Sequence, residues 1–235
     1  MKLQNAVVVI TGGAKGLGNE MAKILVSKGA KVVLCDKDEA EGVIKADVTK
    51  ESELLDVAKK AVEEFGHIDL WINNAGIWMP PETLESIDLE KARKLFDVNV
   101  FGTIDGMRTA IRQMKIQKSG TIMNIISTTA FDGMNGSSGS MYVSSKYALR
   151  GLTNVIREEV SADNISVIAV YPGGMKKDLF QGAVPENADH FMSATDIAEK
   201  IIENLEQDKP QSQLMLKRPD QLASYEFNAI TEEGK

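Results

Sequence analysis

The chain is poor in cysteine and has no long apolar run, and each shortage excludes a class of protein. Its 235 residues include one cysteine, Cys35, so no disulfide can form within the chain and a cytosolic setting is favoured. No stretch approaches the roughly 18 apolar residues of a membrane span. The first apolar run, Ala6–Ile10, is also too short for a signal peptide. We therefore expect a soluble, unprocessed, cytoplasmic protein.

Histidine is also scarce, and basic residues are fewer than acidic ones. The two histidines, His67 and His190, have no ligand-like spacing, so we predict no metal site. Acidic residues number 34 against 27 basic ones, which gives a formal net charge of -7 at pH 7. An acidic surface offers no electrostatic reason to expect nucleic acid or an anionic membrane as a partner.

The remaining composition is that of an ordinary globular protein, with 43% hydrophobic and 26% charged residues, and the length suits one α/β domain. Apolar runs predict strands at Ala6–Ile10, Lys31–Cys35, Ile68–Ile72, Gly120–Ile126, Ile165–Val170 and Gln213–Leu216. Helical periodicity is found at Leu17–Lys28, Glu51–Phe65, Asp88–Gln117, softly broken at Gly102 and Gly106, Tyr142–Ala162 and Thr195–Glu206. This alternation predicts a single domain over residues 1–235, a doubly wound parallel sheet of the Rossmann type, with about seven strands and helices on both faces. Residues 219–235 show little pattern and are expected to form a tail.

A glycine-rich turn separates the first predicted strand from the first predicted helix. It reads Thr11-Gly12-Gly13-Ala14-Lys15-Gly16-Leu17-Gly18. Glycines let the backbone approach a pyrophosphate closely, and the helix N-terminus presents free N–H groups to the anion. The turn predicts a dinucleotide site with contacts from Gly12, Lys15, Gly16, Leu17 and Gly18, although many strand–helix turns need glycine for steric reasons alone.

Asp36 bears on the choice of dinucleotide. It ends the second predicted strand, where an acidic residue can bind the adenosine ribose and would repel a 2′-phosphate. Lys15 and Lys37 argue the other way, because either could reach a phosphate. We predict NAD, with NADP left open and a plain strand-end role for Asp36 as the alternative.

Tyr142 and Lys146 are the candidate proton-transfer pair. They lie four residues apart at the start of a predicted helix, so they share a helical face. A free tyrosine titrates near pH ~10, and a nearby ammonium favours the phenolate and lowers that pKa. The same spacing is common on solvated helix faces, so its weight comes from its place after the strand that ends near Ser127.

Ser127 follows the strand Gly120–Ile126, at the edge where parallel sheets bind ligands. Its hydroxyl could bind a substrate carbonyl oxygen. Thr128 and Thr129 are neighbouring competitors for that role, and a turn or capping serine is the alternative.

The combination resembles the short-chain dehydrogenase/reductase family over about residues 1–216. The motifs that carry the resemblance occur in order. They are Thr11-Gly12 with Gly16 and Gly18, Asp47-Val48, Asn73-Asn74-Ala75-Gly76, Asn99, Ser127, Tyr142 with Lys146, and Pro172-Gly173.

The resemblance implies a role for each motif. Tyr142 would be the general acid/base, Lys146 would lower its pKa and hold the nicotinamide ribose, and Ser127 would orient the substrate oxygen. Asn99 would hold a water in a proton relay through Lys146. Asp47 and Val48 would contact adenine. The other implied cofactor contacts are Asn73, Ala75, Gly76, Pro172, Gly173 and Met175.

Three features depart from the family pattern. The stretch between Asp36 and Asp47 is too short for the usual helix, so we expect a loop or a single turn. Lys177 stands where the family often has a threonine that contacts the nicotinamide carboxamide. The segment 173–193, which should cap the active site, is short.

The predicted substrate is a small or medium apolar carbonyl or secondary alcohol, and no nucleic acid or membrane partner is expected. Its pocket wall would draw on apolar, adaptable side chains, namely Trp78, Met79, Met134, Met141, Met175 and Phe180. The alternatives are a catalytically silent NAD-binding sensor or structural protein, and a reductase of 3-oxoacyl thioesters, which a basic docking patch would support. Relatives pair through their long helices, so we expect a homodimer or homotetramer.

Overall fold

A seven-stranded parallel sheet organises the protein. The computed structural model describes residues 1–132, 139–175 and 191–217, and in these the strand order is β3-β2-β1-β4-β5-β6-β7. The strands are β1 (Val7–Thr11), β2 (Lys31–Asp36), β3 (Val43–Lys45), β4 (Leu70–Asn73), β5 (Gly120–Ile125), β6 (Ile165–Pro172) and β7 (Gln213–Leu216). Every pairing is parallel. The predicted fold is confirmed.

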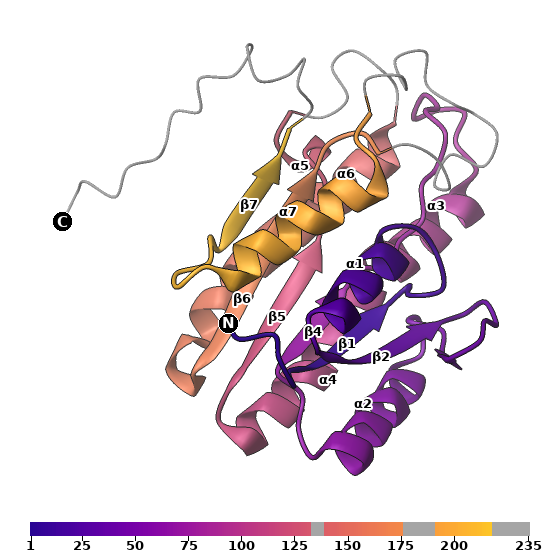
Figure 1. Ribbon diagram of the computed structural model, residues 1–235. Coiled ribbons are helices and arrows are strands. Elements are labelled where there is room, and N and C mark those ends of the chain that lie inside the picture. The colour runs from indigo at the N-terminus through magenta and orange to yellow at the C-terminus, as the bar shows by residue number, and fades with distance from the viewer. Residues whose placement is uncertain (133–138, 176–190, 218–235) are drawn as a thin grey trace.

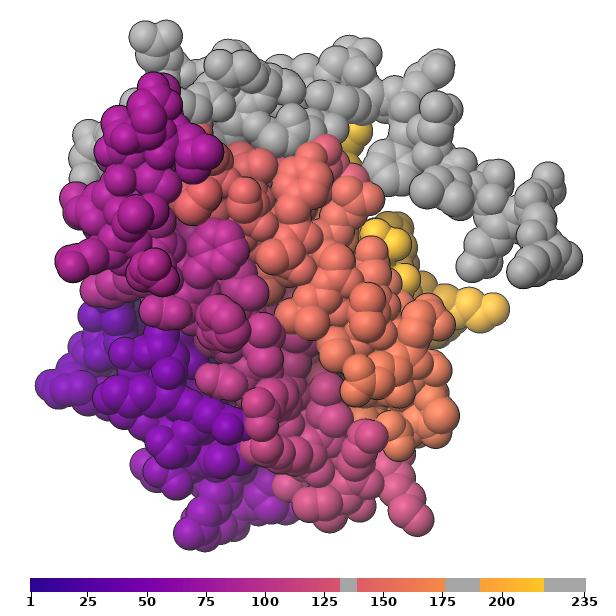
Figure 2. Space-filling view, turned by 180° about the vertical axis from the view of Figure 1, so that it is seen from behind, coloured from indigo at the N-terminus to yellow at the C-terminus, as the bar shows by residue number. Residues whose placement is uncertain are grey.

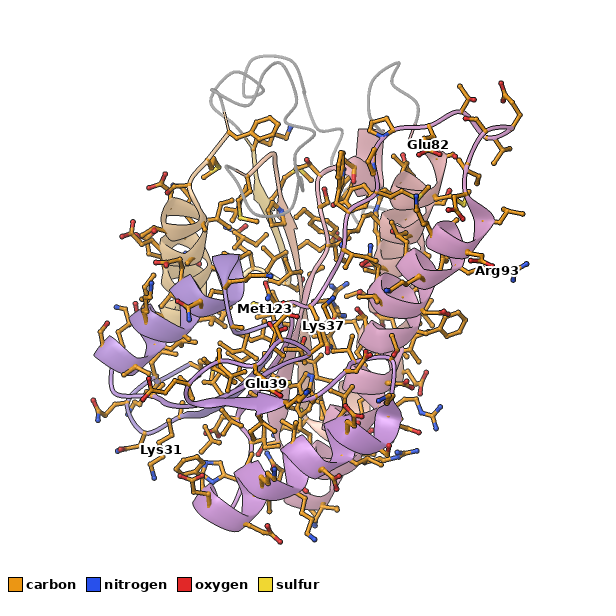
Figure 3. All side chains as sticks on the ribbon, turned by 90° about the vertical axis from the view of Figure 1, so that its right-hand side faces the viewer. Lys31, Lys37, Glu39, Glu82, Arg93 and Met123 are labelled. Atoms are coloured by element: carbon orange, nitrogen blue, oxygen red, sulfur yellow. The ribbon has the colours of Figure 1, made fainter. Side chains whose placement is uncertain are left out.

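Helices cover both faces of this sheet. In Figure 1, α1 (Gly16–Ser27) and α7 (Ala194–Glu206) lie side by side in front of the strands. The opposite face carries α2 (Glu51–Phe65), α4 (Gly102–Gln117) and α6 (Ser140–Glu159). Because both faces are covered, neighbouring strand residues enter different cores: Val8 packs under α1 and α7, whereas Val9 packs under α2 and α4. Figure 3 shows fully buried Met123 of β5 between the two layers.

The chain changes direction across the sheet between β1 and β4. From β1 it proceeds outward through β2 to β3, and then returns to place β4 on the other side of β1. Ligands of such sheets bind at the carboxyl ends of the strands, beside this reversal. The loops after β1 and β4 meet there.

The long predicted helix is in fact three elements. The helix α3 (Leu89–Phe96) passes into a π-helical turn (Asp97–Phe101) and then into α4. The expected break at Gly106 is wrong, because Gly106 is an interior residue of α4. Both glycines serve close packing: an added Cβ would lie 2.7 Å from Val48 Cγ2 at Gly102 and 2.0 Å from Asn73 Oδ1 at Gly106.

Other strand and helix boundaries differ from the predicted ones for local reasons. β4 begins at Leu70 rather than Ile68 because the Gln117 side chain binds both the amide and the carbonyl of Ile68. β6 continues to Pro172, and α6 ends at Glu159, before a 3-10 turn (Ser161–Asp163). As expected, no helix lies between Asp36 and Asp47.

Within the described parts of the chain, no helix is long and apolar enough to span a bilayer. The predicted tail lies outside the described residues, and so does most of the capping segment.

Candidate active site

The glycine-rich turn forms an open cradle between β1 and α1. Gly12 and Gly16 have φ angles of +65° and +58°, which favour glycine. A Cβ at Gly12 would lie 2.8 Å from Ala75 Cα, whereas a Cβ at Gly16 would meet nothing within 4 Å. The backbone is therefore packed against the loop after β4 at Gly12 and accessible at Gly16. At Gly16 α1 begins, and Leu17 and Gly18 are buried.

Asn74 holds this cradle in place. Its Nδ2 donates to the carbonyl oxygens of Thr11, at 3.0 Å, and Gly12, at 2.9 Å. The Thr11 hydroxyl in turn accepts from the amides of Asn74 and Ala75, both at 3.1 Å. The motif Asn73-Asn74-Ala75-Gly76 was recognisable in the sequence, but the positioning role of Asn74 was missed because it depends on the pairing of β1 with β4.

Asp36 lies at the end of β2 beside the cradle and is 8% exposed. Its carboxylate accepts from the amides of Ala14 and Asp38, both at 3.1 Å. Asp38 pairs with Lys15 at 3.0 Å, and both side chains are largely exposed. The two acidic residues thus border the end of the cradle, and Lys15 is already paired with Asp38.

Asp47 and Val48 have clear structural roles. Asp47 Oδ1 accepts from the amide and hydroxyl of Thr49, and its own amide donates to Glu53. Burial acts to raise the pKa of Asp47, but the two Thr49 hydrogen bonds bring it below the usual value. Val48 is buried against Gly102. These contacts fix the start of α2 beside the cradle.

The side chain of Asn73 is buried and hydrogen-bonded within the protein. The residue is 4% exposed, and its Oδ1 accepts from Trp71 Nε1 at 2.9 Å. Its Nδ2 donates to Asn124 Oδ1 at 2.8 Å, and Asn124 donates to Thr153. The side chain of Asn73 therefore belongs to a buried network that joins β4, β5 and α6.

Three candidate catalytic side chains meet where β5 ends and α6 begins. The Tyr142 hydroxyl is hydrogen-bonded to Ser127, which follows β5. Lys146 Nζ lies 5.5 Å from the centre of the Tyr142 ring. Ser127 Oγ also accepts from the amide and the hydroxyl of Thr129, at 3.2 and 3.0 Å. Thr129 therefore supports Ser127.

Burial dominates the titration of this pair. Desolvation raises the pKa of Tyr142 to about 12, against a lowering by the hydrogen bond with Ser127. Desolvation also lowers the pKa of Lys146 to about 8. The expectation that Lys146 brings the tyrosine pKa down is therefore not met in the protein alone. At neutral pH the phenol is protonated and Lys146 is still charged.

Asn99 lies in the π-helical turn and is 1% exposed. Its amide group binds both backbone polar groups of Ile77, at 2.8 and 2.9 Å, and contacts Ser145 Oγ at 3.4 Å. Its carbonyl oxygen accepts from the Thr103 hydroxyl. Asn99 thus ties the loop after β4 to α6, and π-helical turns are frequent at functional sites.

The backbone between β4 and α3 approaches Lys146 at Gly76. A Cβ at Gly76 would lie 3.3 Å from Asn99 Oδ1 and 3.9 Å from Lys146 Nζ. Among the apolar candidates, Met79 is buried, whereas Trp78 and Met141 are partly exposed.

Pro172 and Gly173 lie at the end of β6, where Gly173 donates to the Leu216 carbonyl. Beyond them, Met175 forms a parallel bridge with Met192, and a Cβ at Gly174 would collide with the Phe191 ring. The two ends of the capping segment are thus joined. Met134, Lys176, Lys177, Phe180 and His190 lie outside the described residues.

These residues suit a nicotinamide dinucleotide. The open backbone at Gly16 suits a pyrophosphate, and Asp36 is placed for a ribose. Lys146 is 6% exposed, and within the described residues its ammonium has no hydrogen bond or ion pair. A buried charge without a counterpart is costly, so ribose hydroxyls beside it would satisfy a real deficit.

Comparison with known proteins identifies the family. The model of the short chain dehydrogenase family matches residues 6–188. The chain belongs to this family. The chain is 31% identical over 195 residues to the L-fucose dehydrogenase of Mus musculus. The aligned region covers 78% of this chain and 70% of that enzyme.

Two solved structures that resemble this chain contain a nicotinamide cofactor. The 3-ketoacyl-(acyl-carrier-protein) reductase of Brucella melitensis, complexed with NADH, superposes with a TM-score of 0.79 at 26% identity, over 91% of this chain and 96% of that one. A short chain dehydrogenase of Burkholderia cenocepacia in complex with NADP gives the same TM-score and identity over 92% and 90%. This short-chain dehydrogenase is an NAD(P)-dependent oxidoreductase that transfers hydride.

Proposed function

We propose that the enzyme interconverts a carbonyl compound and a secondary alcohol, with Tyr142 as general acid/base. The observation that carries this proposal is that Tyr142, Ser127 and Lys146 meet at the edge of the sheet where the cradle lies, with Lys146 Nζ 5.5 Å from the centre of the Tyr142 ring. A substrate oxygen that binds both hydroxyls is oriented by Ser127 and receives its proton from Tyr142. Lys146 supplies a positive charge beside them and holds the ribose.

The raised pKa of Tyr142 fits reduction of a carbonyl. With a pKa of about 12 the phenol keeps its proton at pH 7, so it is ready to donate as negative charge develops on the substrate oxygen. When bound, the nicotinamide supplies or accepts the hydride, and its oxidised form adds a positive charge. In the oxidative direction Tyr142 must lose its proton, which this charge and the Lys146 ammonium favour.

Removal of the Tyr142 hydroxyl tests this mechanism. Tyr142→Phe should lower kcat about 100- to 10,000-fold, because general acid catalysis contributes that much. The Kd for NADH, measured by fluorescence, should stay within twofold, because the cradle is untouched. Near-normal turnover in the variant would refute the role.

The substrate class can be tested on a defined panel. We expect turnover of cyclohexanone, 2-octanone or ethyl acetoacetate with NADH, since the described candidates for the pocket wall are apolar. The panel should also include L-fucose and S-acetoacetyl-N-acetylcysteamine, a thioester mimic. NADH binding without turnover of any member would favour a catalytically silent sensor.

A carrier-bound thioester has less support from the surface beside the site. Between Glu82 and Asp97 the described chain carries five acidic side chains and three basic ones. They are Glu82, Glu85, Asp88, Glu90 and Asp97, against Lys91, Arg93 and Lys94. Figure 3 shows Arg93 directed outward from α3, away from Glu82. This surface is no basic docking patch for an acidic carrier.

NAD is the cofactor we propose over NADP. Asp36 and Asp38 both border the cradle, and Asp38 is paired with Lys15. A 2′-phosphate placed there would meet two carboxylates. The exposed Lys37, next to Asp36 in the sequence, is an opposing charge.

We also propose that two copies of the chain pair through α4 and α6. These helices lie side by side on the face shown in Figure 2. Their exposed apolar side chains include Phe101, just before α4, Ile116 and Val155, which are 57%, 77% and 63% exposed. Pairing with a second copy would remove these apolar side chains from water. A tetramer would need a further face, and a cytoplasmic location remains a prediction from Cys35.

A further inference from the structure

A short helix places Ser127. The helix α5 (Thr129–Asp132) has four residues and follows Ser127 almost directly. A single helical turn has little stability of its own, so its position must come from its neighbours. The amide of Ala130 donates to the Ser127 carbonyl at 3.1 Å. Any shift of α5 is therefore passed on to Ser127.

Two side chains of α6 bind the backbone of α5. The Tyr147 hydroxyl donates to the Phe131 carbonyl, and Arg150 Nη1 donates to the Ala130 carbonyl at 3.1 Å. These carbonyls belong to α5, so both side chains of α6 bind its backbone directly. Figure 1 shows α5 beside α6 near the carboxyl ends of the strands.

The Phe131 ring is held from two sides. The Arg150 guanidinium lies 3.7 Å from the ring centre. Tyr171 of β6 meets the same ring edge-on, with centroids 4.7 Å apart and an interplanar angle of 74°. Tyr171 is fully buried in a small core cluster of its own, with Ala130 and Leu149 among its members. Cation–π and edge-to-face contacts each stabilise such an arrangement.

The helix that binds α5 also carries the proton donor. Tyr147 and Arg150 come one and four residues after Lys146 on α6, and Tyr142 lies in the first turn of that helix. We propose that Tyr147 and Arg150 are positioning residues, which set the Ser127 hydroxyl against Tyr142 by fixing α5 to α6. This inference rests on the proposed function, because it assigns a task to both hydroxyls.

Loss of this attachment should lower kcat strongly, although it would move Ser127 only slightly. Misplacement of a reacting group by about 1 Å can lower the rate 100-fold. The cradle, in contrast, is built from β1, β4 and Asn74. NADH affinity should therefore be insensitive to the same substitutions.

The test compares Tyr147→Phe, Arg150→Met and the double variant with two controls. Arg157→Met removes another arginine of α6, which binds the carbonyls of Val167 and Ser212 instead of α5. Tyr171→Phe keeps the ring and removes a buried hydroxyl that has no hydrogen-bond partner among the described residues. We expect the double variant to lower kcat about 10- to 100-fold with the best ketone of the panel, and to leave the Kd for NADH within twofold. Arg150→Lys should recover part of the loss.

Hydrogen exchange in the peptide that contains residues 127–132 reports on α5 directly. It should accelerate in the double variant and stay unchanged in both controls. In a Ser127→Ala background the double variant should cost less than twofold further in kcat, because its effect passes through Ser127. An equal factor in both backgrounds, or unchanged exchange, would overturn the positioning role.

The two proposals fail in different ways. A fully active Ser127→Ala enzyme would overturn the proposed role of Ser127, and with it the route by which Tyr147 and Arg150 act. A slow Ser127→Ala enzyme in which the double variant keeps normal kcat would overturn the positioning role alone.

Discussion

Lys146 carries a buried positive charge that is useful in catalysis and costly to the fold. The ammonium is almost fully enclosed, and within the described residues no carboxylate compensates for its lost hydration. Active sites often hold such unfavourable groups, because the surrounding structure keeps them in place for function. Stability and activity should therefore respond to this residue in opposite directions.

Lys146→Met should raise the free energy of unfolding by roughly 2–3 kcal/mol at pH 7 while turnover is lost. The pKa of Lys146 is about 8 in the folded protein and near 10.5 in the unfolded chain. Between these values the unfolded state binds more protons, so wild-type stability rises with pH and the difference shrinks.

Urea unfolding of both proteins at pH 7 and pH 10, without cofactor, measures this difference. Exposed Lys60 on α2 provides the control, because Lys60→Met should leave the pH dependence unchanged. A variant less stable than wild type at pH 7 would contradict the prediction.

Asp38 should contribute to cofactor choice through Lys15. Asp38→Asn releases that ammonium and removes a negative charge beside the cradle. The ratio of kcat/KM for NADPH to that for NADH should rise about 2- to 5-fold, the range of exposed ion pairs, and less at high salt. Glu39→Gln removes the same charge from the neighbouring pair with Lys45 and should change the ratio little. Equal shifts in both variants would show a general charge effect.

At the scale of elements, glycines in two helices serve different purposes. A Cβ at Gly102, at the start of α4, would lie 2.7 Å from Val48 Cγ2, whereas a Cβ at Gly151 in α6 would meet nothing within 4 Å. Gly102→Ala should destabilise the protein by roughly 1–3 kcal/mol through overpacking. Gly151→Ala should stabilise it by about 0.5–1 kcal/mol, because alanine suits a helix interior better. Urea unfolding measures both changes, and the same sign for the two would refute the packing argument.

The elements themselves were largely predictable from sequence, because buried strands and amphipathic helices repeat at different periods. The alternation of strands and helices predicted a parallel sheet but not the order of its strands. The π-helical turn was missed because one extra residue per turn hardly disturbs the apolar pattern around Val98 and Val100. Gly106 was misread as a break because the sequence does not show that Asn73 lies against it.

The candidate site, too, was predictable only in part. Tyr142, Lys146 and Ser127 were chosen from spacing and from their places after strands, and the structure brings them together. The buried hydrogen bonds of Asn73 were not predicted, because its partner, Asn124, is 51 residues away on another strand. The attachment of α5 by Tyr147 and Arg150 was invisible because it depends on how two short segments meet in space.

At the scale of the whole molecule, the exposed apolar side chains of α4 and α6 predict self-association. Ile116→Glu combined with Val155→Glu should convert the protein to a monomer, because charged groups would have to be desolvated in the interface. Sedimentation velocity measures the change. Val26→Glu on α1, which is 58% exposed on the opposite side of the sheet, should leave the assembly intact. A monomeric wild-type protein would refute the prediction.

The bridge between Met175 and Met192 holds together the two ends of the predicted capping segment. Because the described chain stops and resumes at one point of the frame, the ends of this segment are already closed. Doubling the length of a closed loop costs only about 0.6 kcal/mol. We therefore expect that the predicted capping segment can be replaced by one of different length and chemistry, while the cradle, Tyr142 and Lys146 keep their positions. The substrate specificity of the enzyme could then change while its fold stays the same.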